Sequence, residues 1–106
     1  MTPEEFVAEF KSLKDEIENG YFSNTSDISR IESLKSSGLT DGQIQSVKNI
    51  VSEALTDALY TILLGLDGSA SIGNEQMMYQ LSDEDGNEIS GEIESYAWEI
   101  FHGENT

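Results

Sequence analysis

Cysteine is absent from this chain of 106 residues, and histidine occurs once, as His102. The lack of cysteine excludes disulfides, thiolate metal sites, iron–sulfur clusters and cysteine nucleophiles. A single histidine also excludes a metal site built from paired histidines. The sequence therefore predicts a protein that works without a metal or any other cofactor.

Basic residues are scarce as well. Five Lys and Arg side chains stand against 21 Asp and Glu side chains, which gives a formal net charge of -16 at pH 7. Such a charge repels the phosphates of nucleic acids and the headgroups of anionic lipids. We therefore expect neither nucleic acid nor a membrane surface as a ligand.

The chain also lacks a long hydrophobic run. Its longest apolar stretch, residues 58–66, has about half the roughly 20 residues that a membrane-spanning helix needs. The first residues are acidic and lack the basic start and the apolar block of a secretory signal. These features predict a cytoplasmic protein.

The apolar content is sufficient for a folded domain. Leu, Ile, Val and Phe make up about a quarter of the chain, above the roughly 20% below which a highly charged chain is disordered. The length suits one small domain. We therefore predict a single domain over residues 1–106 with a modest core.

The first predicted helix begins at a capping box. Thr2 is the N-cap, Pro3 occupies the first helical position, and Glu5 lies three residues after the cap. Apolar residues then recur at the helical spacing, at Phe6, Phe10, Leu13 and Ile17. The helix is expected to end at Asn19-Gly20.

Two further helices are predicted before residue 67. A short one is capped by Ser26 or Asp27 and stops at Gly38. The third begins at a second capping box, Thr40 with Gln43, and runs to residue 66. Because residues 53–66 are apolar nearly all round, we expect this second half of the long helix to be the central strut, covered on every side.

The last third of the chain predicts a small β-hairpin and a closing helix. Residues 76–81 have the pattern of a strand, Asp85-Gly86 has that of a hairpin turn, and residues 88–89 pair back. Ser90 is expected to cap the last helix. The predicted fold class is α+β, mainly α, with three N-terminal helices, a long central third helix, a small β-hairpin and a C-terminal helix.

The acidic residues are unevenly distributed. Residues 67–106 contain ten Asp and Glu side chains and no Lys or Arg. Two interpretations are open: the acids form a solvated face, or they form a docking surface whose field attracts a basic partner and rejects others.

Trp98 bears on this choice, because a helical wheel places it beside Glu94 and outside the apolar face of the last helix. A half-exposed Trp within an acidic patch is typical of a binding anchor. The alternative is a rim residue packed on the hairpin. The candidate partner-binding residues are Tyr79, Asp83, Glu84, Asp85, Glu88, Glu92, Glu94, Trp98 and Glu99.

Two motifs resemble known ligand loops without matching them. Asp83, Asp85, Asn87 and Glu94 have the spacing of calcium ligands in an EF-hand, but Glu88 stands where that loop requires Gly. The glycines of residues 68–73 are spaced as in a phosphate loop, yet Asn74 follows where Lys is needed. Neither motif predicts a ligand.

No pattern indicates an enzyme. His102 lies near the end of the chain, where a Ser-His-Asp site is improbable, and the G-x-S-x-G motif does not occur. A small helical domain also offers little room for a deep substrate pocket. We therefore predict a binding protein without catalytic residues.

Four segments carry a resemblance over the C-terminal 40 residues, namely Leu66-Asp67-Gly68, Tyr79-Gln80-Leu81, residues 83–87 and residues 91–97. They resemble small acidic bacterial proteins of the toxin-immunity type. This resemblance implies a cytoplasmic protein that binds a basic toxin domain one to one and blocks its active site. It carries over no site residue, because these proteins share no signature.

Physical reasoning also favours a basic protein as partner, with a toxin nuclease domain as the candidate. Nucleases are basic because they bind phosphates, so an acidic inhibitor complements them. Two alternatives stay open: a nucleic-acid mimic, and a small regulatory subunit without an inhibitory role.

Overall fold

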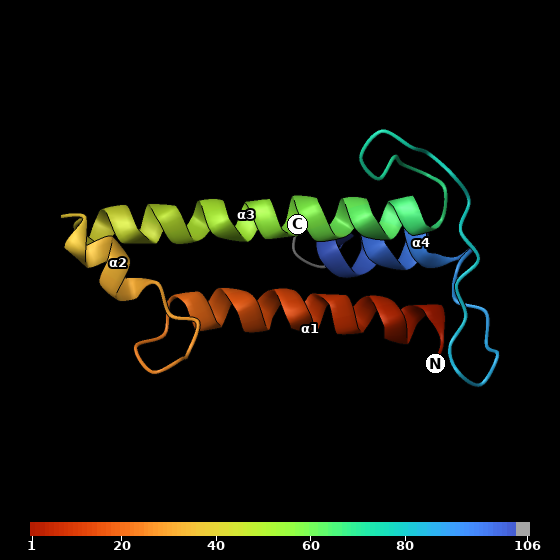
Figure 1. Cartoon of the computed structure of the whole chain (residues 1–106), viewed down its shortest axis with the longest axis horizontal. Helices are drawn as coiled ribbons and strands as arrows, with labels where there is room; N and C mark the ends of the chain where they lie inside the picture. Colours follow the sequence, from red (N-terminus) through yellow and green to blue (C-terminus); the bar gives the residue numbers. More distant parts are fainter. Residues whose placement is uncertain (104–106) are drawn as a thin grey trace.

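The computed structural model describes residues 1–103, and its regular structure is entirely helical in that range. Two long helices, α1 (Pro3–Tyr21) and α3 (Asp41–Leu66), run side by side in opposite directions (Figure 1). The short α2 (Ile31–Ser36) joins them at one end. At the other end lies α4 (Ile93–Trp98), which is followed directly in the chain by the π-helical turn η1 (Glu99–Gly103).

The starts of both long helices confirm the sequence prediction. The Thr2 hydroxyl accepts a hydrogen bond from the Glu5 amide at 3.1 Å, and the Glu5 carboxylate accepts one from the Thr2 amide at 2.8 Å. Thr40 and Gln43 form the same reciprocal pair at the start of α3. Local sequence decides these ends, since both partners of each pair lie within one turn.

The short second helix starts later than predicted. Its N-cap is Arg30, which makes no side-chain capping bond, so neither Ser26 nor Asp27 caps the helix. The Ser26 hydroxyl instead accepts a hydrogen bond from the Ile28 amide within a turn. Gly38 has φ 84°, the left-handed conformation expected after a helix end.

The predicted β-hairpin is wrong. Residues 76–81 form no strand, although the Leu81 carbonyl accepts hydrogen bonds from the Ile89 and Ser90 amides. Within the described chain only two isolated bridges occur, Ile72 with Glu75 and Ser82 with Glu88. The chain does reverse at Asp83–Gly86, yet Ile89 and Ser90 then turn inward and are buried. Two short arms give too few ladder bonds for a stable ribbon, so burial of Ile89 decides the path instead.

The core lies at the end of the molecule where α4 sits. It consists of Val7, Leu63, Ile89, Ile93, Ala97 and Phe101. Because α1 and α3 are antiparallel, the start of α1 and the end of α3 meet here, and α4 contacts both. The radius of gyration is 16.4 Å, against about 13 Å for a compact domain of this length.

The expectation that residues 53–66 of α3 are covered on every side is also wrong. Leu63 is fully buried, whereas Ile62 beside it is 38% exposed. α1 and α4 cover adjacent sides of α3, and Ile72 of the following loop packs on Gly65. Among the described residues, no element covers the side of α3 that carries Ile62.

Candidate functional site

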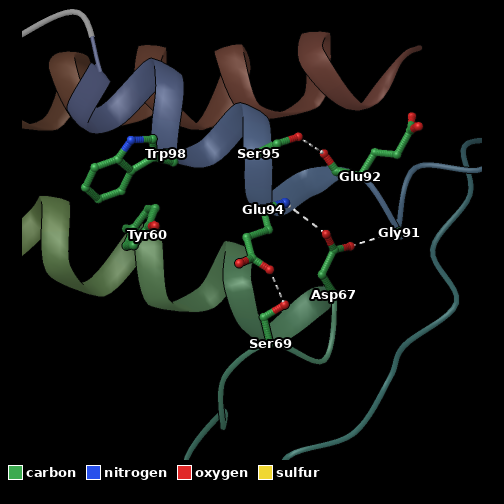
Figure 2. Close-up of a pocket in the computed structure, with 8 residues that line it drawn as sticks. All are labelled: Tyr60, Asp67, Ser69, Gly91, Glu92, Glu94, Ser95 and Trp98. Carbon is green, nitrogen blue, oxygen red and sulfur yellow. Dashed lines mark hydrogen bonds between the residues drawn. The ribbon is translucent and has the colours of Figure 1, made fainter.

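A pocket of about 490 Å³ opens between the end of α3 and the start of α4. Figure 2 shows aromatic side chains at one end and carboxylates at the other. The lining residues are Tyr60, Asp67, Ser69, Gly91, Glu92, Glu94, Ser95 and Trp98. This site joins residues that are more than 30 positions apart in the sequence.

Two rings, Tyr60 and Trp98, form the aromatic end, and His102 packs on both of them. His102 contacts Tyr60 edge to face, with the ring centroids 4.6 Å apart, and contacts Trp98 with the centroids 4.9 Å apart. The Tyr60 and Trp98 centroids are 6.4 Å apart. These contacts hold the indole in place, yet Trp98 remains 57% exposed. Burial, and secondly the charge of Glu94, raise the pKa of the Tyr60 phenol.

Asp67 is a structural part of the pocket. Its two carboxylate oxygens accept hydrogen bonds from the Gly91 amide at 2.6 Å and the Glu94 amide at 2.9 Å. This replaces the predicted cap: Ser90 does not cap α4, whose own N-cap, Glu92, makes no side-chain capping bond. Asp67 thereby fixes the start of α4 against the end of α3, with one hydrogen bond to each of its oxygens.

Glu94 and Glu92 are the carboxylates open to a ligand. One Glu94 oxygen accepts a hydrogen bond from the Ser69 hydroxyl at 2.5 Å. Within residues 1–103 no donor reaches its second oxygen, and the exposed Glu92 carboxylate has no side-chain partner in that range. No Lys or Arg lines the pocket, so these negative charges are uncompensated.

The acidic turn of residues 83–88 lies apart from the pocket, next to the start of α1 (Figure 1). Asp83 holds this turn: it accepts hydrogen bonds from the Asp85 and Asn87 amides, and its other oxygen lies 2.7 Å from the Met1 amino nitrogen. The hydrogen bond from Met1, followed by those from Asn87, holds the pKa of Asp83 well below its ordinary value. Asp83 is therefore a structural carboxylate.

The structure thus divides the predicted binding residues. Glu92, Glu94 and Trp98 meet at the pocket. The turn presents Glu84, Asp85 and Glu88 to solvent, Glu99 is exposed on η1, and Tyr79 is half-buried. The calcium-like spacing does not produce a cluster, because Glu94 is bonded to Ser69 and Asp83 to its own turn.

Sequence reasoning missed Tyr60, Asp67, Ser69 and His102. Tyr60 lies in the apolar half of α3, where an aromatic residue is interpreted as part of the core. Asp67 directly follows the end of the helix, as an ordinary turn residue does. His102 was expected in a frayed terminus, but it packs on two aromatic rings. Only the docking of α4 on α3 brings these residues together.

Comparison of the chain with known protein families, curated proteins and solved structures finds no match. Among residues 1–103, no helix combines the length and the apolar character needed to cross a membrane. The same part of the chain contains no group of three or more His, Cys, Asp or Glu side chains arranged to hold a metal ion. The site is therefore interpreted from its own geometry.

Proposed function

We propose that this chain is an acidic protein-binding module, an immunity protein that binds and neutralises a basic toxin domain in the cytoplasm. The observation that carries the proposal is Trp98, whose ring is fixed by Tyr60 and His102 but remains 57% exposed beside uncompensated carboxylates. A rigid, exposed indole loses little conformational entropy on binding, which is why Trp is enriched among anchor residues of interfaces.

The charge distribution supports a basic partner. Residues 67–106 contain ten acidic side chains and no Lys or Arg, and the exposed Glu92 and Glu94 line the same pocket as Trp98. Such a field speeds encounter with a positively charged surface and disfavours acidic competitors. A nuclease domain has that surface because it binds phosphates.

A nucleic-acid mimic is the second candidate, and one observation favours it. The molecule is elongated, with extents of 49 × 28 × 27 Å, and α1 also carries exposed acids along its length, among them Glu9 and Glu16. A mimic would use this whole acidic length, whereas the proposed module uses the pocket end. The two candidates therefore predict different effects of charge reversal.

The test is affinity capture of a partner, followed by binding kinetics and by inhibition of the partner's activity. We expect Trp98→Ala to weaken binding by more than about 2 kcal/mol, mainly by faster dissociation. Glu92→Lys with Glu94→Lys should slow association, because these charges steer the encounter. Circular dichroism of each variant verifies the fold.

The matched control substitutions lie away from the pocket, one in the first half of α3 and the others on α1. Ile50→Ala removes a similarly exposed apolar side chain, and Glu9→Lys with Glu16→Lys makes the same charge change on α1. Both controls should bind as the wild type does. Loss of binding in the α1 reversal, with normal binding by Trp98→Ala, would exclude the pocket end and favour the mimic.

A further inference from the structure

We propose that the pocket between Tyr60 and Trp98 receives an arginine side chain of the partner. The guanidinium would stack on the Trp98 indole and bond to Glu94. This inference rests on the proposed function and specifies its chemistry. It follows from the size of the pocket, the state of each carboxylate and the geometry of the rings.

The volume suits one long side chain. Pockets that hold small ligands measure about 300–1,000 Å³, and this one measures about 490 Å³. It is open to solvent at the Trp98 side, where more than half of the residue is exposed. A side chain that protrudes from another protein surface can therefore enter without any movement of α4.

The carboxylates define the charge of the occupant. Each Asp67 oxygen accepts one amide hydrogen bond, from Gly91 or from Glu94, so the Asp67 carboxylate is held in place and adds negative charge to the pocket. One Glu94 oxygen accepts a hydrogen bond from the Ser69 hydroxyl, and the other has no donor in the described chain. The Glu92 carboxylate is exposed and has no side-chain partner in the described chain. The pocket thus offers acceptors to a cation, and no basic side chain of its own lining competes for them.

The rings favour arginine over lysine. The edge-to-face contact with His102 takes up one part of the Tyr60 ring, and the Tyr60 and Trp98 planes are tilted by 60°. The two rings therefore cannot sandwich a planar group between them, and a cation that enters the pocket stacks on the exposed Trp98 indole alone. An exposed indole next to a carboxylate suits a planar guanidinium, which stacks and donates in a fixed fork, whereas a lysine ammonium is a compact and strongly hydrated charge.

The sole Trp of the chain makes the test direct, because Trp98 emission reports on this site alone. The probes are acetyl-Gly-Arg-Gly-amide and the same peptide with lysine or with citrulline, the neutral isostere of arginine. In buffered 0.15 M salt we expect a saturable change of Trp98 emission with the arginine peptide. Amide resonances of Ser69 and Glu94 should shift in parallel in NMR spectra.

The affinity order is the decisive result. The lysine peptide should bind about fivefold more weakly than the arginine peptide, and the citrulline peptide at least about tenfold more weakly. Glu94→Gln should weaken the arginine peptide about tenfold, since it removes the charged acceptor. Glu9→Gln, with the same loss of charge on the exposed face of α1, should leave the affinity unchanged.

Two kinds of result overturn the inference. Equal affinity for arginine and lysine, or an equal effect of Glu94→Gln and Glu9→Gln, would mean that the protein attracts cations only through its net charge. No saturable response would mean that the pocket is not a cation site. If the arginine peptide binds as expected but Trp98→Ala leaves the captured partner bound, the pocket does prefer arginine, but Trp98 is not the partner's anchor and the observation that carries the proposed function fails.

Discussion

Single carboxylates in this protein have distinct roles that their sequence context does not reveal. Asp67 and Asp83 both follow apolar segments and both belong to the acid-rich part of the chain. In the structure, Asp67 caps α4 from another element and Asp83 organises a turn. Glu94 and Glu92 remain available to a ligand. The difference is set by the backbone amides that face each carboxylate.

The pH dependence of stability should report on Asp83. Because its pKa is lowered in the folded state, its stabilising effect is full above the unfolded pKa of about 4 and is lost as the pH falls toward the folded value. Conversely, the pKa of the Met1 amino group is raised, chiefly by the hydrogen bond to Asp83. That contribution is full below the unfolded pKa of 8.0 and is lost as the pH rises through the folded value.

We therefore predict that Asp83→Asn lowers the urea midpoint at neutral pH and that its difference from the wild type shrinks between about pH 5 and pH 2. Asp85→Asn makes the same change at an exposed position of the same turn. It should not show this pH-dependent difference. A constant difference for Asp83→Asn across the range would contradict the proposed effect of its ionisation.

At the scale of elements, α3 is a helix with two different halves. Its second half packs on α1 and α4 through Leu63, while Ile50 in the first half is largely exposed. The sequence already makes the second half the more apolar one, but it does not show which of its sides are covered. Which turns are covered depends on where α4 docks.

Alanine substitutions along α3 should measure this difference. We expect Leu63→Ala to cost about 2–5 kcal/mol of unfolding free energy, because it leaves a cavity in the core. Leu59→Ala should cost less, since Leu59 is half-buried at the edge of the core. Ile50→Ala is the matched control and should stay within about 0.5 kcal/mol. Equal urea midpoints for Leu63→Ala and Ile50→Ala would show that the core lies elsewhere.

The loop of residues 67–92 was predicted less well from the sequence than the starts of the capped helices. Its turn residues were identified correctly, since the chain does reverse at Asp83–Gly86. The strands were predicted wrongly. A two-stranded ribbon needs ladder hydrogen bonds along its length, and these two short arms make too few of them. Met77 and Met78 are accordingly exposed.

At the scale of the whole molecule, the protein has a packed end and an open end. The core residues belong to α1, α3, α4, η1 and the segment that leads into α4, all near the pocket. α2, at the far end, buries none of its residues. Local opening should therefore be more frequent at the far end, because few buried contacts oppose it.

Native-state hydrogen exchange followed by NMR tests this asymmetry within one helix. We predict that amides of residues 58–64 exchange at least about tenfold more slowly than those of residues 45–52, after correction for intrinsic rates. Both segments lie inside α3, away from its frayed ends. Uniform protection along α3 would contradict the two-ended description.

The sequence by itself determined the features that depend on neighbours within one turn. The capping boxes at Thr2 and Thr40, the extent of α3 and the reversal near Asp85 all follow from local hydrogen bonding and helical periodicity. It also determined the charge and its concentration in the last third of the chain.

The tertiary structure alone decided which faces are covered and which side chains meet. α4 is capped by Asp67 rather than by Ser90, the predicted β-hairpin is replaced by a loop that forms no strand, and one side of α3 is open. The pocket joins Tyr60 with Trp98 because two helices distant in sequence pack together. Such contacts depend on how a short chain shares its limited apolar surface among competing partners, and no local pattern encodes that division.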